Sequence, residues 1–330
     1  MLPSKPVDWF TKKPLVEKVT YPTLHGQASG DLYRPSGGGP HRAIVVCLGV
    51  VPFETEHPQV PRLGAALARS GFAALLYWSP AMRDLRLEPD DIDNIALAYE
   101  WLIDQPYVDS EKSGLLGTCV GGSFSLMAAA SPRIREKVSF LAVYAPYSSM
   151  FTLLQDAASS STVRADIREP WQVDQLTRKV FVRSLTAELE PDEAELLWEV
   201  FSVGDGQLEI DKLSYNGRAI YSLLTNPDAD EAERIMDQLP SDFRDRLSAM
   251  SPINYLKYIQ SPLIILLHDC GDSVIPVGES RRLRAMLQSH AGFHYKELQF
   301  QHLNPAKLPV FRLARELAKF YTALYKLFLY

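Results

Sequence analysis

Short apolar runs recur along much of the chain and are separated by segments with helical spacing. Continuous runs of this kind are typical of strands buried on both faces of a parallel sheet. Between two of them, residues 92–103 place apolar side chains at the spacing of an amphipathic helix. The segments that we expect to form strands are residues 16–21, 30–33, 43–48, 72–77, 113–118, 138–144, 263–267 and 295–299. Strands that alternate with helices predict an α/β protein, with a mainly parallel sheet flanked by helices.

The pattern changes between residues 150 and 249, where helical periodicity dominates and strand-like runs nearly vanish. We therefore predict that residues 1–149 and 250–330 form an α/β core, and that residues 150–249 form a helical cap inserted into it. A cap in this position would exclude water from a site at the sheet edge and shape a pocket there. A helical insertion that serves only dimerisation is the alternative.

Residues 113–130 contain the most informative motif, an apolar strand that enters a glycine-flanked turn and then an alanine-rich helix. Cys119 occupies the turn, with Gly117 and Gly121 two residues to either side. A nucleophile elbow needs such small neighbours, because its reactive side chain sits on a sharp strand-to-helix turn. The alternative is a buried cysteine that packs in an ordinary turn and has no chemical role. The glycine spacing fits neither common nucleotide-binding motif. Cys119 is thus a candidate nucleophile for acyl chemistry.

A loop with several carboxylates follows the apolar strand at residues 263–267. The carboxyl ends of parallel strands are where open α/β sheets bind ligands. Asp272 is the preferred acid of a catalytic triad. Asp269 is its competitor, since it leaves the strand first and could instead accept hydrogen bonds from loop amides.

The general base is expected in a later loop. Among the histidines after the acid loop, His302 follows the last predicted strand directly, whereas His294 should begin that strand at the opposite edge of the sheet. His290 precedes it as well. The candidate nucleophile, acid and base follow one another along the chain as Cys119, Asp272 and His302. This is the order in which the three triad residues occur in α/β-hydrolases.

Two backbone N–H groups are expected to stabilise an oxyanion. One belongs to Val120, directly after the candidate nucleophile, and the other to Val50 or Val51 in the loop after the strand at residues 43–48.

With these residues in place, the chain resembles the α/β-hydrolase superfamily. The segment Gly-Thr-Cys-Val-Gly-Gly at residues 117–122 is similar to the elbow of dienelactone hydrolases, which use Cys, Asp and His. The resemblance covers residues 1–149 and 250–330. It implies an α/β-hydrolase fold with Cys119 as nucleophile, Asp272 as acid and His302 as base. The capped arrangement is also similar to bile-acid-type acyltransferases and acyl-CoA thioesterases.

These features predict a hydrolase that cleaves an ester, thioester or lactone through an acyl-enzyme intermediate. Such chemistry needs a small-molecule acyl substrate and neither a cofactor nor a metal. The helix after the elbow and the histidine should favour the Cys119 thiolate. An acyltransferase that uses an amine or alcohol acceptor is the alternative enzyme. A binding protein with an inert Cys119 is the alternative from another class.

The composition of the chain limits the size of its core, its partners and the compartment in which we expect it. The chain has 330 residues, 46% of them hydrophobic, which is enough for one large core or two smaller ones. A formal charge of -6 with scattered basic residues gives no reason to expect nucleic acid or a membrane surface as partner. No secretory signal or spanning segment is recognisable, and the cysteines Cys47, Cys119 and Cys270 are odd in number and far apart. We expect a cytoplasmic protein, and the apolar stripe of the C-terminal helix allows a homo-oligomer.

Overall fold

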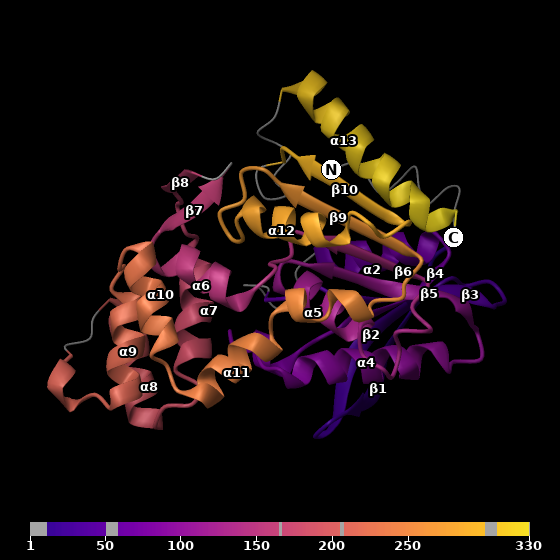
Figure 1. Cartoon of the computed structure of the whole chain (residues 1–330). Coiled ribbons are helices and arrows are strands. Elements are labelled where there is room, and N and C mark those ends of the chain that lie inside the picture. The colour runs from indigo at the N-terminus through magenta and orange to yellow at the C-terminus, as the bar shows by residue number, and fades with distance from the viewer. Residues whose placement is uncertain (1–11, 51–58, 165–166, 205–207, 301–308, 330) are drawn as a thin grey trace.

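An eight-stranded sheet forms the centre of the molecule in the computed structural model, which describes residues 12–50, 59–164, 167–204, 208–300 and 309–329 (Figure 1). The strand order is β1-β2-β4-β3-β5-β6-β9-β10. Within this sheet, the pairs β1–β2 and β2–β4 are antiparallel and the other described pairs are parallel. The strands are β1 (Leu15–Thr23), β2 (Gly26–Arg34), β3 (His41–Cys47), β4 (Phe72–Tyr77), β5 (Val108–Thr118), β6 (Phe140–Tyr144), β9 (Leu263–Asp269) and β10 (Phe293–Leu298).

Every residue of β4 and of β9 is buried, as continuous apolar runs require of strands covered on both faces. Helices α4 (Asp90–Ile103), α5 (Val120–Ala129) and α12 (Val277–Leu287) cover one face and share its apolar core. Helices α2 (Gln59–Arg69) and α13 (Val310–Leu324) cover the other. A short helix, α3 (Pro80–Arg83), follows β4.

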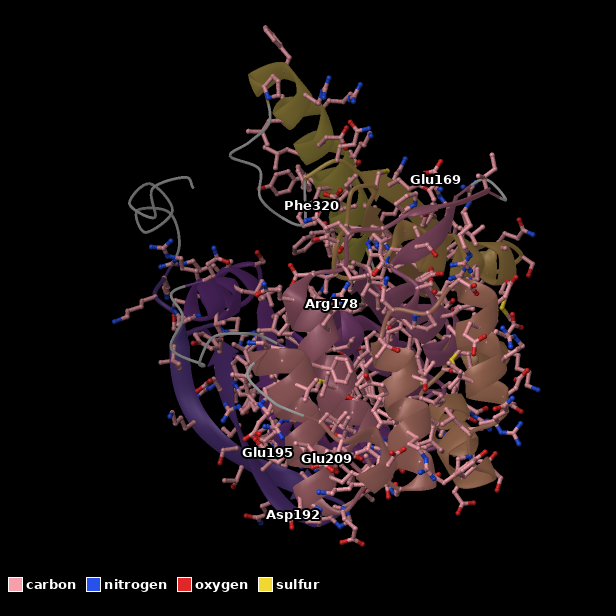
Figure 2. The ribbon with its side chains drawn as sticks, turned by 90° about the vertical axis from the view of Figure 1, so that its left-hand side faces the viewer. Glu169, Arg178, Asp192, Glu195, Glu209 and Phe320 are labelled. Carbon is pink, nitrogen blue, oxygen red and sulfur yellow. The ribbon has the colours of Figure 1, made fainter. Side chains whose placement is uncertain are left out.

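The chain between β6 and β9 forms a helical body beside the sheet (Figure 1), and Figure 2 views the molecule from the side of these helices. A hairpin of β7 (Ser161–Arg164) and β8 (Ile167–Pro170) interrupts it, which the sequence did not predict. Its helices are α6 (Met150–Ala158), α7 (Gln175–Leu185), α8 (Pro191–Trp198), a π-helix (Glu199–Val203), α9 (Tyr215–Leu224), α10 (Ala229–Asp237) and α11 (Ser241–Ala249). Short 3-10 turns lie at Ile210–Lys212 in the insertion, and at Pro252–Asn254, Leu256–Tyr258 and Tyr325–Phe328 after it. The predicted mainly parallel sheet with a helical insertion is confirmed, while the division into separate core and cap domains stays a prediction.

Glu279 of α12 joins the sheet to the first helix of this insertion. Its fully buried carboxylate accepts hydrogen bonds from the backbone N–H groups of Ser148 and Ser149, at 2.7 and 3.3 Å, and from the hydroxyl of Thr152 at 2.8 Å. Arg282 pairs with the same carboxylate. A negative charge at the start of α6 satisfies N–H groups that lack partners within the helix. The carboxylate therefore fixes where the insertion leaves the sheet.

In the part of the chain that the structure describes, no helix combines the length and apolar character needed to cross a lipid bilayer.

Candidate active site

Cys119 stands at the junction of β5 and α5 in a backbone conformation that side chains rarely adopt, with φ 55° and ψ -134°. Its N–H donates to the carbonyl of Tyr144 at 2.8 Å, and its carbonyl accepts from the N–H of Gly122 at 2.9 Å. A residue other than glycine in such a region costs about 1–3 kcal/mol, which the surrounding hydrogen bonds must offset. This strain is what a side chain held at the tip of a sharp strand-to-helix turn entails.

The two flanking glycines are required by close backbone contacts. A Cβ atom on Gly121 would lie 2.3 Å from the carbonyl oxygen of Cys47 at the end of β3. One on Gly117 would lie 2.5 Å from the carbonyl oxygen of Gly121. Any side chain here would push α5 away from the sheet, so these glycines allow the turn at Cys119.

The loop after β9 brings two buried carboxylates to the same edge of the sheet. Asp272 accepts hydrogen bonds from the N–H groups of Val274 and Ile275, at 2.7 and 3.1 Å. Asp269 accepts one from the N–H of Gly271 at 2.8 Å. Of the two, Asp272 lies near enough to Cys119 for its negative charge to raise the pKa of the thiol. The structure therefore brings Asp272, rather than Asp269, into the electrostatic environment of the candidate nucleophile.

The surroundings of Cys119 favour the neutral thiol. Burial raises its pKa to about 12, and the charges of Asp272 and Asp174 act in the same direction. The N–H of Val120, at the start of α5, is hydrogen-bonded to the sulfur and lowers the pKa, but by less. The sequence predicts that the helix start and the histidine favour the thiolate. The helix start does lower the pKa of Cys119, but burial and the two carboxylates raise it by more. Deprotonation of Cys119 at neutral pH therefore needs a base.

The predicted base, His302, lies outside the described residues. His294 is the second residue of β10 and pairs with Ile265, so it lies toward the amino end of the strand, away from the edge that carries Cys119. His290 precedes β10 on the same side. The placement of these two histidines agrees with the reason for preferring His302.

The oxyanion candidates can be placed only in part. Val50 and Val120 are buried next to the elbow, and Val51 lies outside the described residues. The hydroxyl of Thr118, just before the nucleophile, donates to the carbonyl of Leu48 at 2.9 Å. This bond holds the loop after β3 against the elbow.

An apolar cavity opens beside Cys119. Core loops form one wall, and helices α6 and α7 of the insertion form the other. Its lining residues are Val50, Leu87, Cys119, Val120, Leu153, Leu176, Thr177, Val180, Phe181, Val274 and Ile275. A pocket with this lining binds hydrocarbon in preference to charged groups.

Three hydrogen bonds tie the insertion to the acid loop. The indole N–H of Trp171 donates to the carbonyl of Asp272 at 3.2 Å, and the N–H of Asp174 donates to Ser273 at 2.9 Å. The hydroxyl of Thr177 donates to the carbonyl of Val274 at 2.9 Å. The start of α7 therefore holds the acid loop as well as one wall of the cavity.

His268, near the end of β9, is a buried site residue that sequence reasoning did not consider. Its Nε2 donates to the carbonyl of Ile275 at 2.9 Å, which requires the hydrogen on Nε2, and its Nδ1 accepts from the hydroxyl of Ser280 at 2.6 Å. Nε2 lies 3.9 Å from Oδ2 of Asp272. With both nitrogens engaged, His268 supports the acid loop and is not available as a base.

We expect His268 to make the protein less stable in mild acid. Burial lowers its pKa below the usual value, so below about pH 6.5 the unfolded chain binds a proton that the folded chain does not. The free energy of unfolding should then fall with decreasing pH, by up to about 1.4 kcal/mol per pH unit for this one group. Urea unfolding at several pH values should show a shallower fall in His268→Gln. The control His290→Gln should keep the wild-type slope, and equal slopes in all three proteins would contradict the assignment.

Comparison with known proteins finds matches only among solved structures; no protein-family model and no curated protein matches the chain. The acylaminoacyl peptidase of Pyrococcus horikoshii superposes with a TM-score of 0.54 at 15% identity, over 98% of this chain and 44% of the peptidase. This chain thus spans less than half the length of that protein. The α/β hydrolase GrgF from Penicillium sp. sh18 superposes with a TM-score of 0.54 at 16% identity, over 94% of this chain and 99% of GrgF. A 2,6-dihydroxy-pseudo-oxynicotine hydrolase gives 0.51 at 15% identity, over 95% of this chain and 69% of its own. Together with the sheet order and the elbow, these similarities show that the chain has the α/β-hydrolase fold.

Proposed function

We propose that this protein is a hydrolase that cleaves a carboxylic ester, a thioester or a lactone through an acyl-enzyme intermediate on Cys119. The observation that carries the proposal is the strained elbow, which presents a thiol to an apolar cavity beside the N–H of Val120. Similar solved structures include proteins named as a peptidase and as hydrolases, which supports bond cleavage as the reaction class. A thiol, a nearby carboxylate and backbone donors are three of the groups that acyl transfer to cysteine uses, and a base is the fourth.

In the proposed mechanism His302, oriented by Asp272, accepts the proton of Cys119 as the sulfur attacks the acyl carbon. The bond to the leaving oxygen or sulfur breaks, and the histidine gives its proton to the leaving group. His302 then takes a proton from water as the water oxygen attacks the thioester. The carbon–sulfur bond breaks, the proton returns to Cys119, and the carboxylic acid is released.

The oxyanion formed at each attack would be held by the N–H of Val120 and by that of Val50 or Val51. The N–H of Val120 already contacts the sulfur, so an oxygen on the adjacent acyl carbon would lie within its reach. Donors fixed before the reaction stabilise developing charge without reorganisation. Residues 150–249 would act as the cap that excludes water from this intermediate, since α6 and α7 line the cavity.

A panel of p-nitrophenyl esters of increasing acyl length, followed with intact mass during turnover, tests the proposal. We expect a burst of p-nitrophenol and an acyl adduct that peptide mapping assigns to Cys119, because hydrolysis of a thioester follows its formation. Products formed with added amines or alcohols would instead indicate an acyltransferase. If neither oxygen esters nor acyl thioesters give release or an adduct, the protein is better explained as a binding protein.

The role of His302 predicts a change in pH dependence. Because the Cys119 thiol has a pKa raised to about 12, an enzyme without its base depends on rare thiolate. We expect His302→Ala to lose about 10²–10⁴-fold in acylation rate at pH 7. The remaining rate should rise about tenfold per pH unit through the alkaline range, where the wild type reaches a plateau.

Single-turnover acylation rates between about pH 6 and pH 10 measure this difference. His290→Ala serves as the matched control and should keep the wild-type profile. A plateau in His302→Ala at the same pH as in the wild type would exclude His302 as the base.

A further inference from the structure

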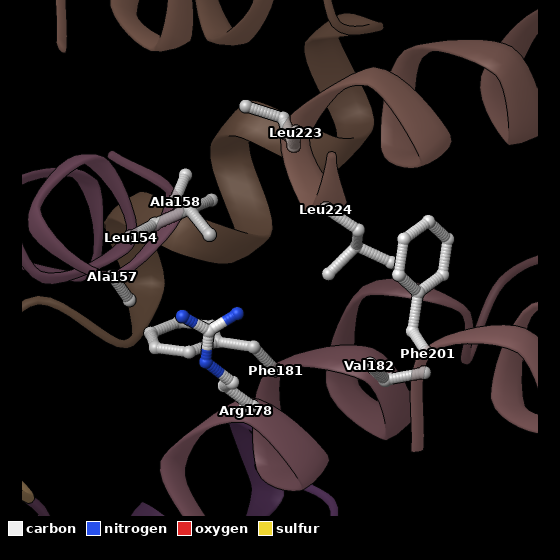
Figure 3. Close-up of a pocket in the computed structure, with 9 residues that line it drawn as sticks. All are labelled: Leu154, Ala157, Ala158, Arg178, Phe181, Val182, Phe201, Leu223 and Leu224. Atoms are coloured by element: carbon white, nitrogen blue, oxygen red, sulfur yellow. The ribbon is translucent and has the colours of Figure 1, made fainter. Parts of the chain in front are cut away.

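The insertion contains a second cavity (Figure 3), and Cys119 is not among the residues that line it. It lies between α6, α7, the π-helix and α9, and we call it the outer cavity; the one beside Cys119 is the inner cavity. The outer cavity is lined by aliphatic and aromatic side chains and by a single charged residue, Arg178. An apolar cavity with one charged group is suited to a hydrocarbon that carries a polar end.

The two cavities meet at Phe181. Among the described residues, this side chain alone lines both, and it is nearly buried. The helices on either side continue from one cavity to the other: in α6, Leu153 lines the inner cavity and Leu154 the outer one, and in α7, Val180 and Val182 divide in the same way. A rotation of the Phe181 ring would therefore join the two spaces along the α6–α7 groove.

Arg178 lies at the solvent side of the outer cavity, and Figure 2 shows it near the middle of the face formed by the insertion. Its guanidinium donates to the hydroxyl of Ser160 at 3.0 Å. Elsewhere in the insertion, Arg168 bonds Asp156 and Arg183 bonds Glu195, whereas within the described residues no carboxylate lies within 4.0 Å of Arg178. Figure 3 shows the guanidinium among the residues that line the cavity, so its remaining donors can reach a ligand there.

We infer that the inner and outer cavities together bind one extended acyl chain whose far end carries a carboxylate, with Phe181 as the side chain that limits chain length and Arg178 as the group that binds the carboxylate. This inference rests on the proposed acyl-enzyme function, because it places the acyl carbon at Cys119. Apolar contacts along α6 and α7 would stabilise the chain, and a planar guanidinium suits a carboxylate better than an ammonium does. Phe181 and Arg178 are thus specificity residues and take no part in bond breaking.

The Phe181 side chain is tested by the dependence of kcat/KM on acyl length. p-Nitrophenyl acetate, octanoate and dodecanoate are compared in the wild type, Phe181→Ala and Phe181→Trp. We expect Phe181→Ala to raise the dodecanoate-to-acetate ratio about tenfold, since removal of the ring opens the outer cavity to the chain. Phe181→Trp should lower the same ratio. Leu197→Ala, at a buried position outside both linings, is the control and should leave the ratio unchanged.

Arg178 is tested with two dodecanoyl esters that differ only at the far end, one methyl-ended and one carboxylate-ended. We expect Arg178→Gln to lower kcat/KM for the carboxylate-ended ester by about fivefold, the scale of a partly exposed ion pair, and to leave the methyl-ended ester unchanged. Lys179→Gln removes the same charge one residue along the helix without lining either cavity, and should change neither ester.

The outcomes separate this inference from the proposed function. No acyl adduct on Cys119 with any ester, acetate included, would refute the proposed function. If the acetate ester is turned over, but both Phe181 variants have the dodecanoate-to-acetate ratio of the wild type, the joined cavities are refuted and the proposed function is not. An equal effect of Arg178→Gln on both dodecanoyl esters would refute carboxylate recognition. If Phe181→Ala fails to fold, the opposite shift expected of Phe181→Trp still decides the question.

Discussion

Replacement of Cys119 by alanine is expected to reduce turnover of any acyl substrate by at least about 10⁴-fold, because the alanine methyl group cannot form the covalent intermediate. The intact-mass measurement should then show no acyl adduct. Cys270→Ala is the matched control, since Cys270 lies at the same sheet edge but its sulfur donates to Glu297 at 3.2 Å. Cys270→Ala should keep wild-type turnover. Retention of most activity by Cys119→Ala would remove Cys119 from the mechanism.

The backbone conformation at Cys119 also predicts a difference in stability between two inactive variants. Alanine keeps the strain of φ 55°, whereas glycine adopts positive φ freely. We therefore expect Cys119→Gly to have a free energy of unfolding about 1 kcal/mol larger than that of Cys119→Ala, and so to unfold at a higher temperature. Both variants should be inactive. Thermal unfolding of the two variants measures the difference. A less stable glycine variant would mean that the backbone at the elbow is not strained by its side chain.

Asp272→Asn is expected to lower turnover by about 10³–10⁴-fold, because an amide cannot stabilise an imidazolium as a carboxylate does. The same substitution should make the Cys119 thiol more reactive when no acyl substrate is present. The charge of Asp272 raises the pKa of Cys119, so its removal lowers that pKa and increases the thiolate fraction at a given pH. Alkylation of Cys119 by iodoacetamide should therefore be faster in Asp272→Asn than in the wild type, although acyl turnover is slower.

Asp269→Asn is the matched control for this pair of measurements. Its carboxylate accepts from Gly271 in the same loop, but it is not among the charges that act on the Cys119 thiol. We expect turnover within about threefold of the wild type and an unchanged alkylation rate. The reverse result, a large loss in Asp269→Asn and a small one in Asp272→Asn, would make Asp269 the acid.

Sequence periodicity is enough to predict the elements that position the site, because each follows from contacts within a few residues. The runs that became β4 and β9 are apolar at nearly every position, and burial on both faces is the one environment that suits such strands. The elbow is likewise local. Gly117 and Gly121 stand where a Cβ would meet backbone atoms, so their spacing around Cys119 records the turn directly. The hairpin β7–β8 was missed because its strands are short and exposed along β8, without apolar alternation.

The sequence by itself therefore determined the α/β sheet, the helical insertion and the turn that carries Cys119. Only the tertiary structure decided the charge environment of the thiol, the supporting role of His268 and the two cavities that meet at Phe181. These depend on side chains far apart in sequence: Asp272 acts on Cys119 across the sheet edge, and Glu279 reaches Ser148 from another helix. Periodicity reports which face of an element is buried, but not which neighbour it meets. Burial, hydrogen bonding and the proximity of charges are properties of those neighbours, so they appear only when the chain is folded.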